Sequence, residues 1–374
     1  MTGSGPRILV VSGEMGAGHN AAGRAVVEAA RQRWPGCEDV WVDTLDVMGP
    51  GVGPTFRGFY VGNVRYTPRL YQFYFEANWR VRWFAQSSKW VVGAWSGPPL
   101  ERVIRRTRPD LIISTYPLGS AGLDWLRRRG RLNVPVQVWV CDFAPHPFWV
   151  YHHLQHHFVM HEVAEPAVRA VAPDARVRVV APPVDARFTP GDTTTARAAV
   201  GLDPEGFVAF VSCGSFGFGT VESAVRTLLD ADERVRVIAA TGRNEVLGER
   251  LRALPEAGGR LSAPGWLDDI PEWLRASDVV VTNAGGATAL EALATNTPVL
   301  MFQPIAAHGR ANAEYMADAG LADICDTTDE LASTVRELAT DAAALSSRRE
   351  AMAKHCAGRS LVDDVAALPP RGWE

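Results

Sequence analysis

Short apolar runs alternate with longer amphipathic stretches along the first half of the chain. Ala21–Arg33 has the spacing of an amphipathic helix, and a second helical stretch covers residues 99–107. The apolar runs predict β-strands at Ile8–Ser12, Val40–Asp43, Leu111–Ser114, Val136–Val140 and Phe158–Met160. Strands that alternate with helices are typical of a parallel, doubly wound sheet, so we expect an α/β fold.

The same alternation restarts after a proline-rich connection at residues 181–192, which indicates a second domain. Further strands are predicted at Phe207–Ser212, Val235–Ala239, Val279–Thr282 and Val299–Phe302. We therefore expect one domain over residues 1–188 and another over 189–374. Two α/β domains that face each other form a central cleft at the carboxyl ends of their strands, where such folds bind ligands.

Composition narrows the class of protein. The chain has 374 residues, of which 47% are hydrophobic and 21% charged, as in a soluble protein of two domains. No apolar run approaches the ~18 residues that span a bilayer, and the first one lacks the flanks of a signal peptide. We expect a cytoplasmic protein. Its five cysteines form no Cys-x-x-Cys pair, which argues against a disulfide framework or a structural zinc site.

Charge is divided unevenly between the halves. Residues 1–190 carry 22 Lys+Arg and 15 Asp+Glu, a net of +7, whereas residues 191–374 carry 16 and 27, a net of −11. A basic half favours an anionic partner, and charge alone leaves nucleic acid and a membrane surface open.

Residues 56–95 depart from the α/β rhythm. They hold 13 of the 33 aromatic residues and six cations, Arg57, Arg65, Arg69, Arg80, Arg82 and Lys89, against one acid, Glu76. Aromatic rings mixed with cations are typical of a membrane-interface anchor. A helical subdomain with an aromatic core fits equally well, so both interpretations stay open.

Three turns that follow predicted strands are candidate ligand sites. In the first, residues 13–19, Gly16 and Gly18 lead to His19, which can be a general base or a residue that caps the helix. In the second, Cys213–Thr220, small residues can expose amides to a phosphate or form a plain turn. In the third, Asn283–Ala292, Glu291 can accept hydrogen bonds from ribose hydroxyls or complement the helix dipole.

Several spaced motifs between about residues 7 and 322 resemble one enzyme family. Gly265-Trp-Leu-Asp-Asp-Ile270 and Asn283-Ala-Gly-Gly-x-Thr-x-x-Glu291 resemble the nucleotide-binding half of the MurG-like glycosyltransferases of family 28. The motifs of the first half resemble those of the monogalactosyldiacylglycerol synthases and bacterial diacylglycerol glucosyltransferases. They are Ser12-Gly-x-x-Gly-x-Gly-His19, Asp142-Phe-Ala-Pro-His-Pro-x-Trp149 and Pro183-Val-x-x-x-Phe188.

This resemblance implies a GT-B fold of two facing Rossmann-like domains, with the last helix crossing back to the first domain. The second domain would bind a UDP-sugar: Leu267 lies in the loop for uracil, and Glu291 would bind the ribose. The residues implied for the phosphates are Gly214, Ser215, Gly217, Gly285, Gly286 and Thr288. The first domain would bind the acceptor near Gly16, Gly18 and His146.

The resemblance also implies that His19 removes the proton of the acceptor hydroxyl. Asp142 would orient His19 or the acceptor, although Asp142 can also cap a strand end while His146 braces the proline turn. Where relatives carry Gln and Glu near the donor sugar, this chain has His308, Arg310 and Asn312, with Gly309 at the place of a common acid. The sugar is therefore left open.

We expect neither a metal nor a cofactor, because two helix N-termini can stabilise the UDP leaving group. Five histidines, at 152, 153, 156, 157 and 161, could suggest a metal site. His157 and His161 lie in a predicted strand, where that spacing exceeds 13 Å and is too long for one ion, so we expect a solvated or interface cluster instead.

The sequence thus predicts an inverting glycosyltransferase that moves a hexose from a UDP-sugar to a hydroxyl of a diacylglycerol-like lipid. Its expected partners are the UDP-sugar, the lipid and an anionic membrane surface on the inner face of the membrane, and not nucleic acid. Three alternatives stay open: transfer to a soluble specialised metabolite, a UDP-sugar epimerase, and a non-catalytic sugar-nucleotide sensor.

Overall fold

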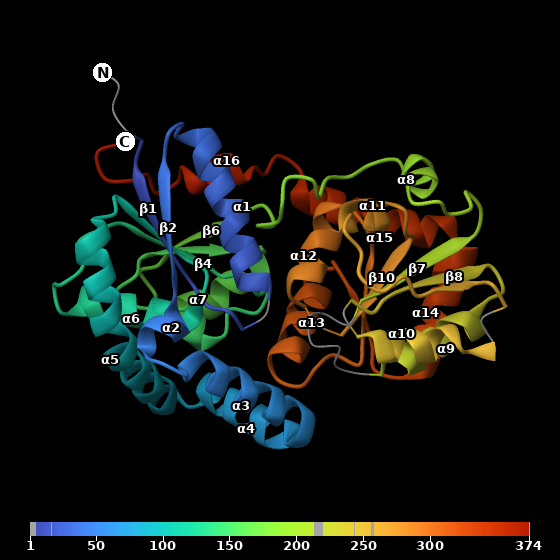
Figure 1. Cartoon of the computed structure of the whole chain (residues 1–374), viewed down its shortest axis with the longest axis horizontal. Helices are drawn as coiled ribbons and strands as arrows, with labels where there is room; N and C mark the ends of the chain where they lie inside the picture. The colour runs from blue at the N-terminus through green and yellow to red at the C-terminus, as the bar shows by residue number, and fades with distance from the viewer. Residues whose placement is uncertain are drawn as a thin grey trace. The chain divides into compact units, whose positions relative to one another are not determined.

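The computed structural model describes residues 5–15, 17–212, 220–242, 244–255, 258–283 and 285–373, and its chain divides into two compact units (Figure 1). The first unit comprises Met1–Asp185, Ala306–His308 and Gly358–Glu374. The second comprises Ala186–Ile305 and Gly309–Ala357. We predicted the second domain over 189–374; residues 358–374 pack with the first unit, to which the resemblance implied that the last helix crosses back.

A six-stranded parallel sheet forms the centre of the first unit, in the order β2-β1-β3-β4-β5-β6. Its strands are β1 (Arg7–Ser12), β2 (Glu38–Asp43), β3 (Leu111–Ser114), β4 (Val136–Trp139), β5 (His156–Val159) and β6 (Arg176–Val179). The order reverses direction at β1. Because such crossovers are right-handed, α1 lies on one face with α16, and α5 and α6 pack together on the other.

The helices of the first unit include a long aromatic segment between β2 and β3. They are α1 (Ala17–Arg33), α2 (Thr44–Met48), α3 (Val52–Tyr66), α4 (Pro68–Arg80), α5 (Arg82–Thr107), α6 (Pro117–Arg128), α7 (Glu165–Val171) and α16 (Leu361–Val365). Two short 3-10 turns, η1 (Pro147–Trp149) and η2 (Glu162–Ala164), follow β4 and β5. The predicted helical stretch 99–107 is the last part of α5.

The second unit repeats this plan with the strand order β12-β11-β10-β7-β8-β9, again all parallel. Its strands are β7 (Phe207–Ser212), β8 (Val235–Ala240), β9 (Leu261–Ser262), β10 (Val279–Thr282), β11 (Val299–Phe302) and β12 (Asp323–Cys325). The strand order reverses between β7 and β10. The carboxyl ends of these two strands therefore form the topological switch point, where open α/β sheets bind ligands.

Helices cover both faces of this second sheet. They are α8 (Thr193–Ala199), α9 (Val221–Ala231), α10 (Glu245–Arg252), α11 (Ile270–Arg275), α12 (Ala287–Ala294), α13 (His308–Asp318), α14 (Thr328–Thr340) and α15 (Ala342–Cys356). The central strands β7, β10 and β11 are almost wholly buried, as parallel strands covered on both faces must be.

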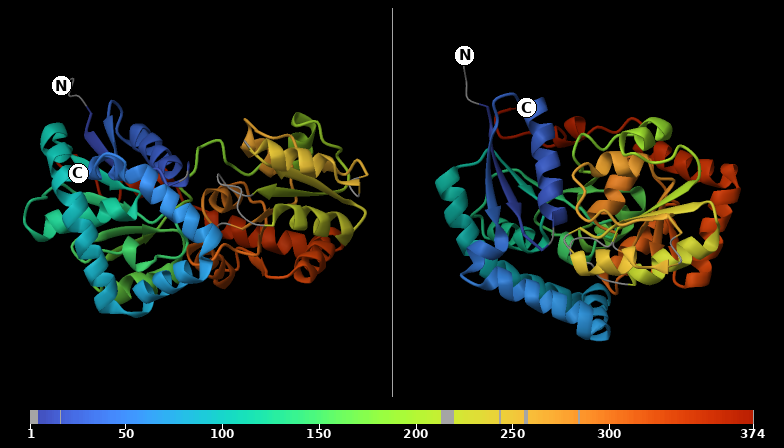
Figure 2. Two further views of the ribbon diagram at one scale, coloured as in Figure 1. Left: turned by 60° about the horizontal axis from the view of Figure 1, so that its bottom comes forward. Right: turned by 45° about the vertical axis from the view of Figure 1, so that its right-hand side comes forward.

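Side-chain hydrogen bonds fix the C-terminal segment to the first unit. Gln137 of β4, fully buried, donates from Nε2 to the carbonyls of Val365 (2.7 Å) and Leu368 (2.9 Å). The Asp364 carboxylate accepts from Arg178 Nε and from the Ala181 amide, each at 2.9 Å. In Figures 1 and 2 the red end of the chain accordingly returns to the blue strands.

No helix in the described part of the chain has both the length and the hydropathy needed to cross a bilayer.

Candidate functional site

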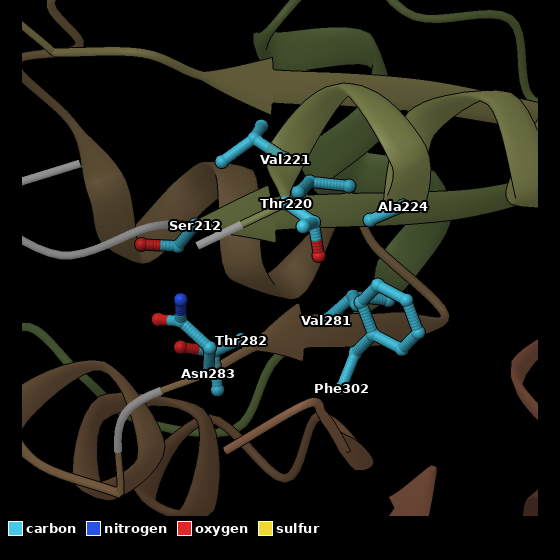
Figure 3. Close-up of a pocket in the computed structure, with 9 residues that line it drawn as sticks. Ser212, Thr220, Val221, Ala224, Val281, Thr282, Asn283 and Phe302 are labelled. Atoms are coloured by element: carbon cyan, nitrogen blue, oxygen red, sulfur yellow. The ribbon is translucent and has the colours of Figure 1, made fainter. Parts of the chain in front are cut away.

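A pocket opens in the second unit at the switch point between β7 and β10. Figure 3 shows the Ser212 hydroxyl and the Asn283 amide on one side of it and the Phe302 ring on the other. The lining residues come from β7, β10, β11 and the start of α9: Val211, Ser212, Thr220, Val221, Ala224, Val281, Thr282, Asn283 and Phe302. Four of these lining residues are polar, Ser212, Thr220, Thr282 and Asn283, and can bind a ligand through hydrogen bonds.

The start of α12 closes tightly over the same strand ends. Thr288 Oγ1 lies 3.5 Å from Ser212 Oγ. Gly285 packs against the buried Asn312 of α13 so closely that a Cβ on this glycine would lie 2.4 Å from the Asn312 Cβ. Gly285, Thr288 and Asn312, three of the predicted donor-site residues, are therefore brought to one place beside the pocket. Gly286 and the half-buried Glu291 belong to the same helix start and its second turn.

The other predicted donor residues lie in different surroundings. Leu267 is half-buried and follows Trp266, whose indole N–H donates to Asp268. Arg310 pairs with the carboxylates of Glu314 and Asp326, which raise its pKa and compensate its charge. Gly214, Ser215 and Gly217, like Gly16 of the first unit, lie outside the described residues.

His19 lies at the carboxyl end of β1 in the first unit. The helix α1 begins at Ala17, so Gly18 and His19 belong to its first turn rather than to the preceding loop. The imidazole lies between the rings of Tyr116 (centroids 5.2 Å apart) and Trp149 (5.7 Å). Gly13 makes this packing possible, because a Cβ there would lie 2.4 Å from the Tyr116 ring.

Asp142 follows β4 and lies on the same edge of the sheet. Its Oδ2 accepts a 2.7 Å hydrogen bond from the indole N–H of Trp149. Burial lowers the pKa of His19, while the Asp142 charge and the Thr115 backbone oppose that shift. The Nδ1 atom of His19 is itself buried and has no hydrogen-bond partner of ordinary geometry in the described structure. The imidazole is thus neutral at neutral pH, with a carboxylate near enough to favour its protonated form.

His146 braces the turn after Asp142. Its Nδ1 accepts from the Phe148 amide at 3.3 Å, and its Nε2 lies 3.4 Å from the Phe75 carbonyl. The ring stacks on Phe75 of α4, with centroids 4.1 Å apart. Burial lowers the pKa of His146 to about 4, so it stays neutral near pH 7. These contacts match the bracing interpretation of His146.

The aromatic helices α3, α4 and the start of α5 have a packed side and an exposed side. Phe59, Phe73 and Trp83 are each 70% exposed. Further exposed apolar side chains on these helices are Phe56, Tyr66, Leu70, Tyr74, Trp90, Val91 and Trp95. We call these ten residues the aromatic surface. On the packed side, Tyr60 and Tyr71 meet edge to face, and Phe75 stacks on His146. Both interpretations of residues 56–95 therefore describe part of the segment.

Most of the cations that we counted in this segment have partners within the first unit. The Lys89 ammonium donates to the Val150 carbonyl at 2.7 Å, and burial lowers its pKa to about 8. Arg82 donates to the Ala170 carbonyl, Arg80 pairs with Glu76, and Arg57 pairs with Glu14. The exposed character of the segment is thus more aromatic than cationic.

His308, the first residue of α13, is counted with the first unit. Its Nε2 lies 3.3 Å from the Tyr60 hydroxyl, and its Nδ1 lies 3.3 Å from the Tyr71 hydroxyl. Arg310 and Asn312, the other two residues predicted near the donor sugar, belong to the second unit.

Two ring contacts of His19 were not among the predicted site residues. Trp149 stands at the end of the Asp142-Phe-Ala-Pro-His-Pro-x-Trp motif, so its spacing could have drawn attention to it. Tyr116 follows β3 with no such signal, and only the fold places it beside His19.

The two units match two family models in succession. Residues 19–184 match the model of monogalactosyldiacylglycerol (MGDG) synthase. Residues 208–365 match the glycosyltransferase family 28 C-terminal domain. The first match lies within the first unit, whereas the second covers most of the second unit and extends into α16, which packs with the first unit. Each match includes one of the two clusters described above.

Relatives with whole-chain similarity agree with these models. The chain is 24% identical over 351 residues to a processive diacylglycerol beta-glucosyltransferase of Staphylococcus carnosus, covering 92% of this chain and 88% of that protein. Among solved structures, the glycotransferase of kitacinnamycin has a TM-score of 0.59 at 17% identity over 97% of this chain and 99% of that one. Acinetobacter baumannii MurG has a TM-score of 0.54 at 15% identity over 96% and 99%. These two likenesses show the fold.

The contact of Gly285 with Asn312 gives a prediction for the second unit. Gly285→Ala should lower the melting temperature, because the new methyl group collides with Asn312 and overpacking of this kind costs ~1–3 kcal/mol. Gly286→Ala is the matched control, since no atom lies within 4 Å of its added Cβ. Equal melting temperatures for the two variants would contradict the packing described here.

Proposed function

Because the chain belongs to the GT-B glycosyltransferases of family 28, in the branch of the monogalactosyldiacylglycerol synthases, we propose that it transfers a hexose from a UDP-sugar to a lipid hydroxyl. The acceptor that we propose is diacylglycerol or a glycosylated form of it. The observation that carries this proposal is the neutral His19, held beside a carboxylate at the end of β1.

In the proposed reaction, His19 accepts the proton of the acceptor hydroxyl. The acceptor oxygen forms a bond to the anomeric carbon from the face opposite UDP, and the bond from that carbon to the diphosphate breaks, which inverts the configuration. The imidazolium that results is stabilised by Asp142. Two features of the site support this role: burial lowers the pKa of His19 and so keeps the ring neutral before the reaction, and the Asp142 charge favours the imidazolium that forms.

The second unit would hold the donor. The amides of Gly285 and Gly286 and the Thr288 hydroxyl are proposed to bind the diphosphate at the start of α12, where backbone N–H groups and the helix dipole favour an anion. Glu291 would accept hydrogen bonds from the ribose, and the backbone around Leu267 would hold the uracil. The same dipole would stabilise the leaving UDP, so we propose no metal.

The aromatic surface is proposed to rest on the membrane that holds the acceptor. Phe59, Phe73 and Trp83 come from three different helices and are each 70% exposed. Buried in lipid, such side chains contribute ~1.5–3 kcal/mol each. The exposed Arg69 and Arg80 of α4 would add a smaller attraction to anionic headgroups. The enzyme would thus be a peripheral protein on the face of the membrane where UDP-sugars occur.

The role of His19 gives a direct prediction. His19→Ala should lower the turnover number for transfer by ~10²-fold or more, because the acceptor hydroxyl loses its base. The affinity for UDP, measured by calorimetry, should stay unchanged. His152→Ala, at an exposed histidine of the same unit, is the control and should keep full activity. Retained turnover in His19→Ala would remove His19 from the mechanism.

The same base predicts the pH dependence. Only the neutral imidazole can accept a proton, and the pKa of His19 is lowered from its ordinary 6.5. The wild-type turnover number should therefore stay constant from pH 8 down to below pH 6.5 and fall only at lower pH. A turnover number that already falls between pH 8 and pH 6.5 would contradict the neutral, buried state of His19.

The aromatic surface gives a prediction about membrane binding. Phe73→Ser together with Trp83→Ser should lower co-sedimentation with anionic lipid vesicles by ~10-fold or more, because two inserted rings are lost. UDP affinity should not change. Val246→Ser, at a 62% exposed valine of α10 in the other unit, is the control. Vesicle binding that survives the double substitution would assign the membrane contact elsewhere.

A further inference from the structure

The turn after β4 holds a tryptophan that contacts both His19 and Asp142. We infer that Trp149 is a positioning residue, which tethers the Asp142 carboxylate beside His19 so that this carboxylate acts on the imidazole. The inference rests on the proposed role of His19 as the base. It goes beyond that role because it explains what holds the Asp142 carboxylate in place beside the base, and it assigns this task to Trp149.

The contacts of Trp149 are of two kinds. Its indole N–H donates to Asp142 Oδ2 at 2.7 Å, a short hydrogen bond of the charge-assisted type. Its ring lies 5.7 Å from the imidazole of His19, between centroids, at an interplanar angle of 53°. Trp149 is only 2% exposed and Asp142 is half-buried, so the indole side of this bond is shielded from solvent. This bond restricts the rotation of the Asp142 carboxylate.

The segment that carries Trp149 is itself fixed from three sides. On the side of α6, the Tyr151 hydroxyl of this segment donates to the carbonyl of Pro117, the first residue of α6, at 2.9 Å. From α4, Phe75 stacks on His146. From α5, the Lys89 ammonium binds the Val150 carbonyl at 2.7 Å and lies 5.0 Å from the Tyr151 ring centroid. The place of the indole is therefore set by the fold, and Asp142 takes its orientation from the indole.

The charge at Asp142 acts on a crowded set of titratable groups. Those that face His19 are Asp142 after β4, Tyr116 after β3, and His308, whose pKa is in turn lowered by His19. Burial raises the pKa of Tyr116 far above neutrality, so it stays uncharged. Burial also lowers the pKa of His308, so Asp142 is the charged group that opposes the effect of burial on His19.

A double-mutant cycle tests the inference. The His19 imidazole is titrated by NMR in the wild type, Trp149→Phe, Asp142→Asn and the double variant, and its signal is assigned by its loss in His19→Ala. Asp142→Asn should lower the pKa of His19, because a negative charge that favours the imidazolium is removed. Trp149→Phe should shift this pKa in the same direction, and it should change it little once Asp142 is already Asn.

Activity gives a second readout of the same cycle. Trp149→Phe should lower the turnover number by ~10-fold and leave the KM for the UDP-sugar unchanged, with the acidic limb of the pH profile moved to lower pH. Trp139→Phe is the matched control, because Trp139 is also buried and donates its indole proton to a side chain, Gln137, at 2.8 Å. It should change neither the His19 titration nor the profile.

Two outcomes would overturn the inference. One is an equal effect of Trp149→Phe with Asp142 present and absent, and the other is an effect matched by Trp139→Phe. If Trp149→Phe does not fold, the indole N–H resonance of Trp149 in Asp142→Asn serves instead: it should move upfield on loss of the charged acceptor, and an unmoved resonance would contradict the tether. The titrations need no substrate, so they test Trp149 even if His19 is not the base.

Discussion

The site in the first unit depends on one constraint, the partial burial of an imidazole beside a single tethered carboxylate. Desolvation keeps His19 neutral, and the negative charge of Asp142 limits how far its pKa falls. The neighbouring residues serve this balance. Gly13 has no side chain, so the Tyr116 ring can cover one side of the imidazole, and Trp149 covers another while it binds Asp142.

This constraint connects the aromatic helices to the chemistry. Their exposed side carries Phe73 and Trp83, whereas their packed side reaches the turn after β4 through Phe75 and Lys89. The same two helices, α4 and α5, therefore present an exposed apolar surface and also contact the turn that carries Trp149. In our proposal, the helices that contact the membrane also support the turn that orients Asp142 beside the base.

The fold was largely predictable from the sequence because buried parallel strands are continuous apolar runs. Leu111–Ser114, Phe207–Ser212, Val279–Thr282 and Val299–Phe302 form strands with the predicted bounds. The strands that we did not predict are β6, β9 and β12, of two to four residues, with few buried side chains and no apolar run. The return of residues 358–374 to the first unit uses polar contacts such as those of Gln137, which leave no periodic signal, so only the family resemblance implied it.

The candidate site was predictable only where a motif marked it. The motifs led to His19, Asp142, Gly285, Thr288 and Asn312, and the structure places each beside a strand end. Partners that meet through tertiary packing had no such signal. Tyr116 beside His19, the inward use of Lys89 and the carboxylates that bind Arg310 all depend on which elements the fold brings together.

The most direct test of the account is the release of UDP from a panel of UDP-sugars, with and without diacylglycerol vesicles. We predict release from one UDP-hexose that depends on the lipid, with a glycosylated diacylglycerol as the product. UDP release that is equal with and without the lipid would contradict the lipid acceptor and favour a soluble acceptor or an epimerase. No release with any sugar, despite UDP binding, would contradict the proposed transfer itself.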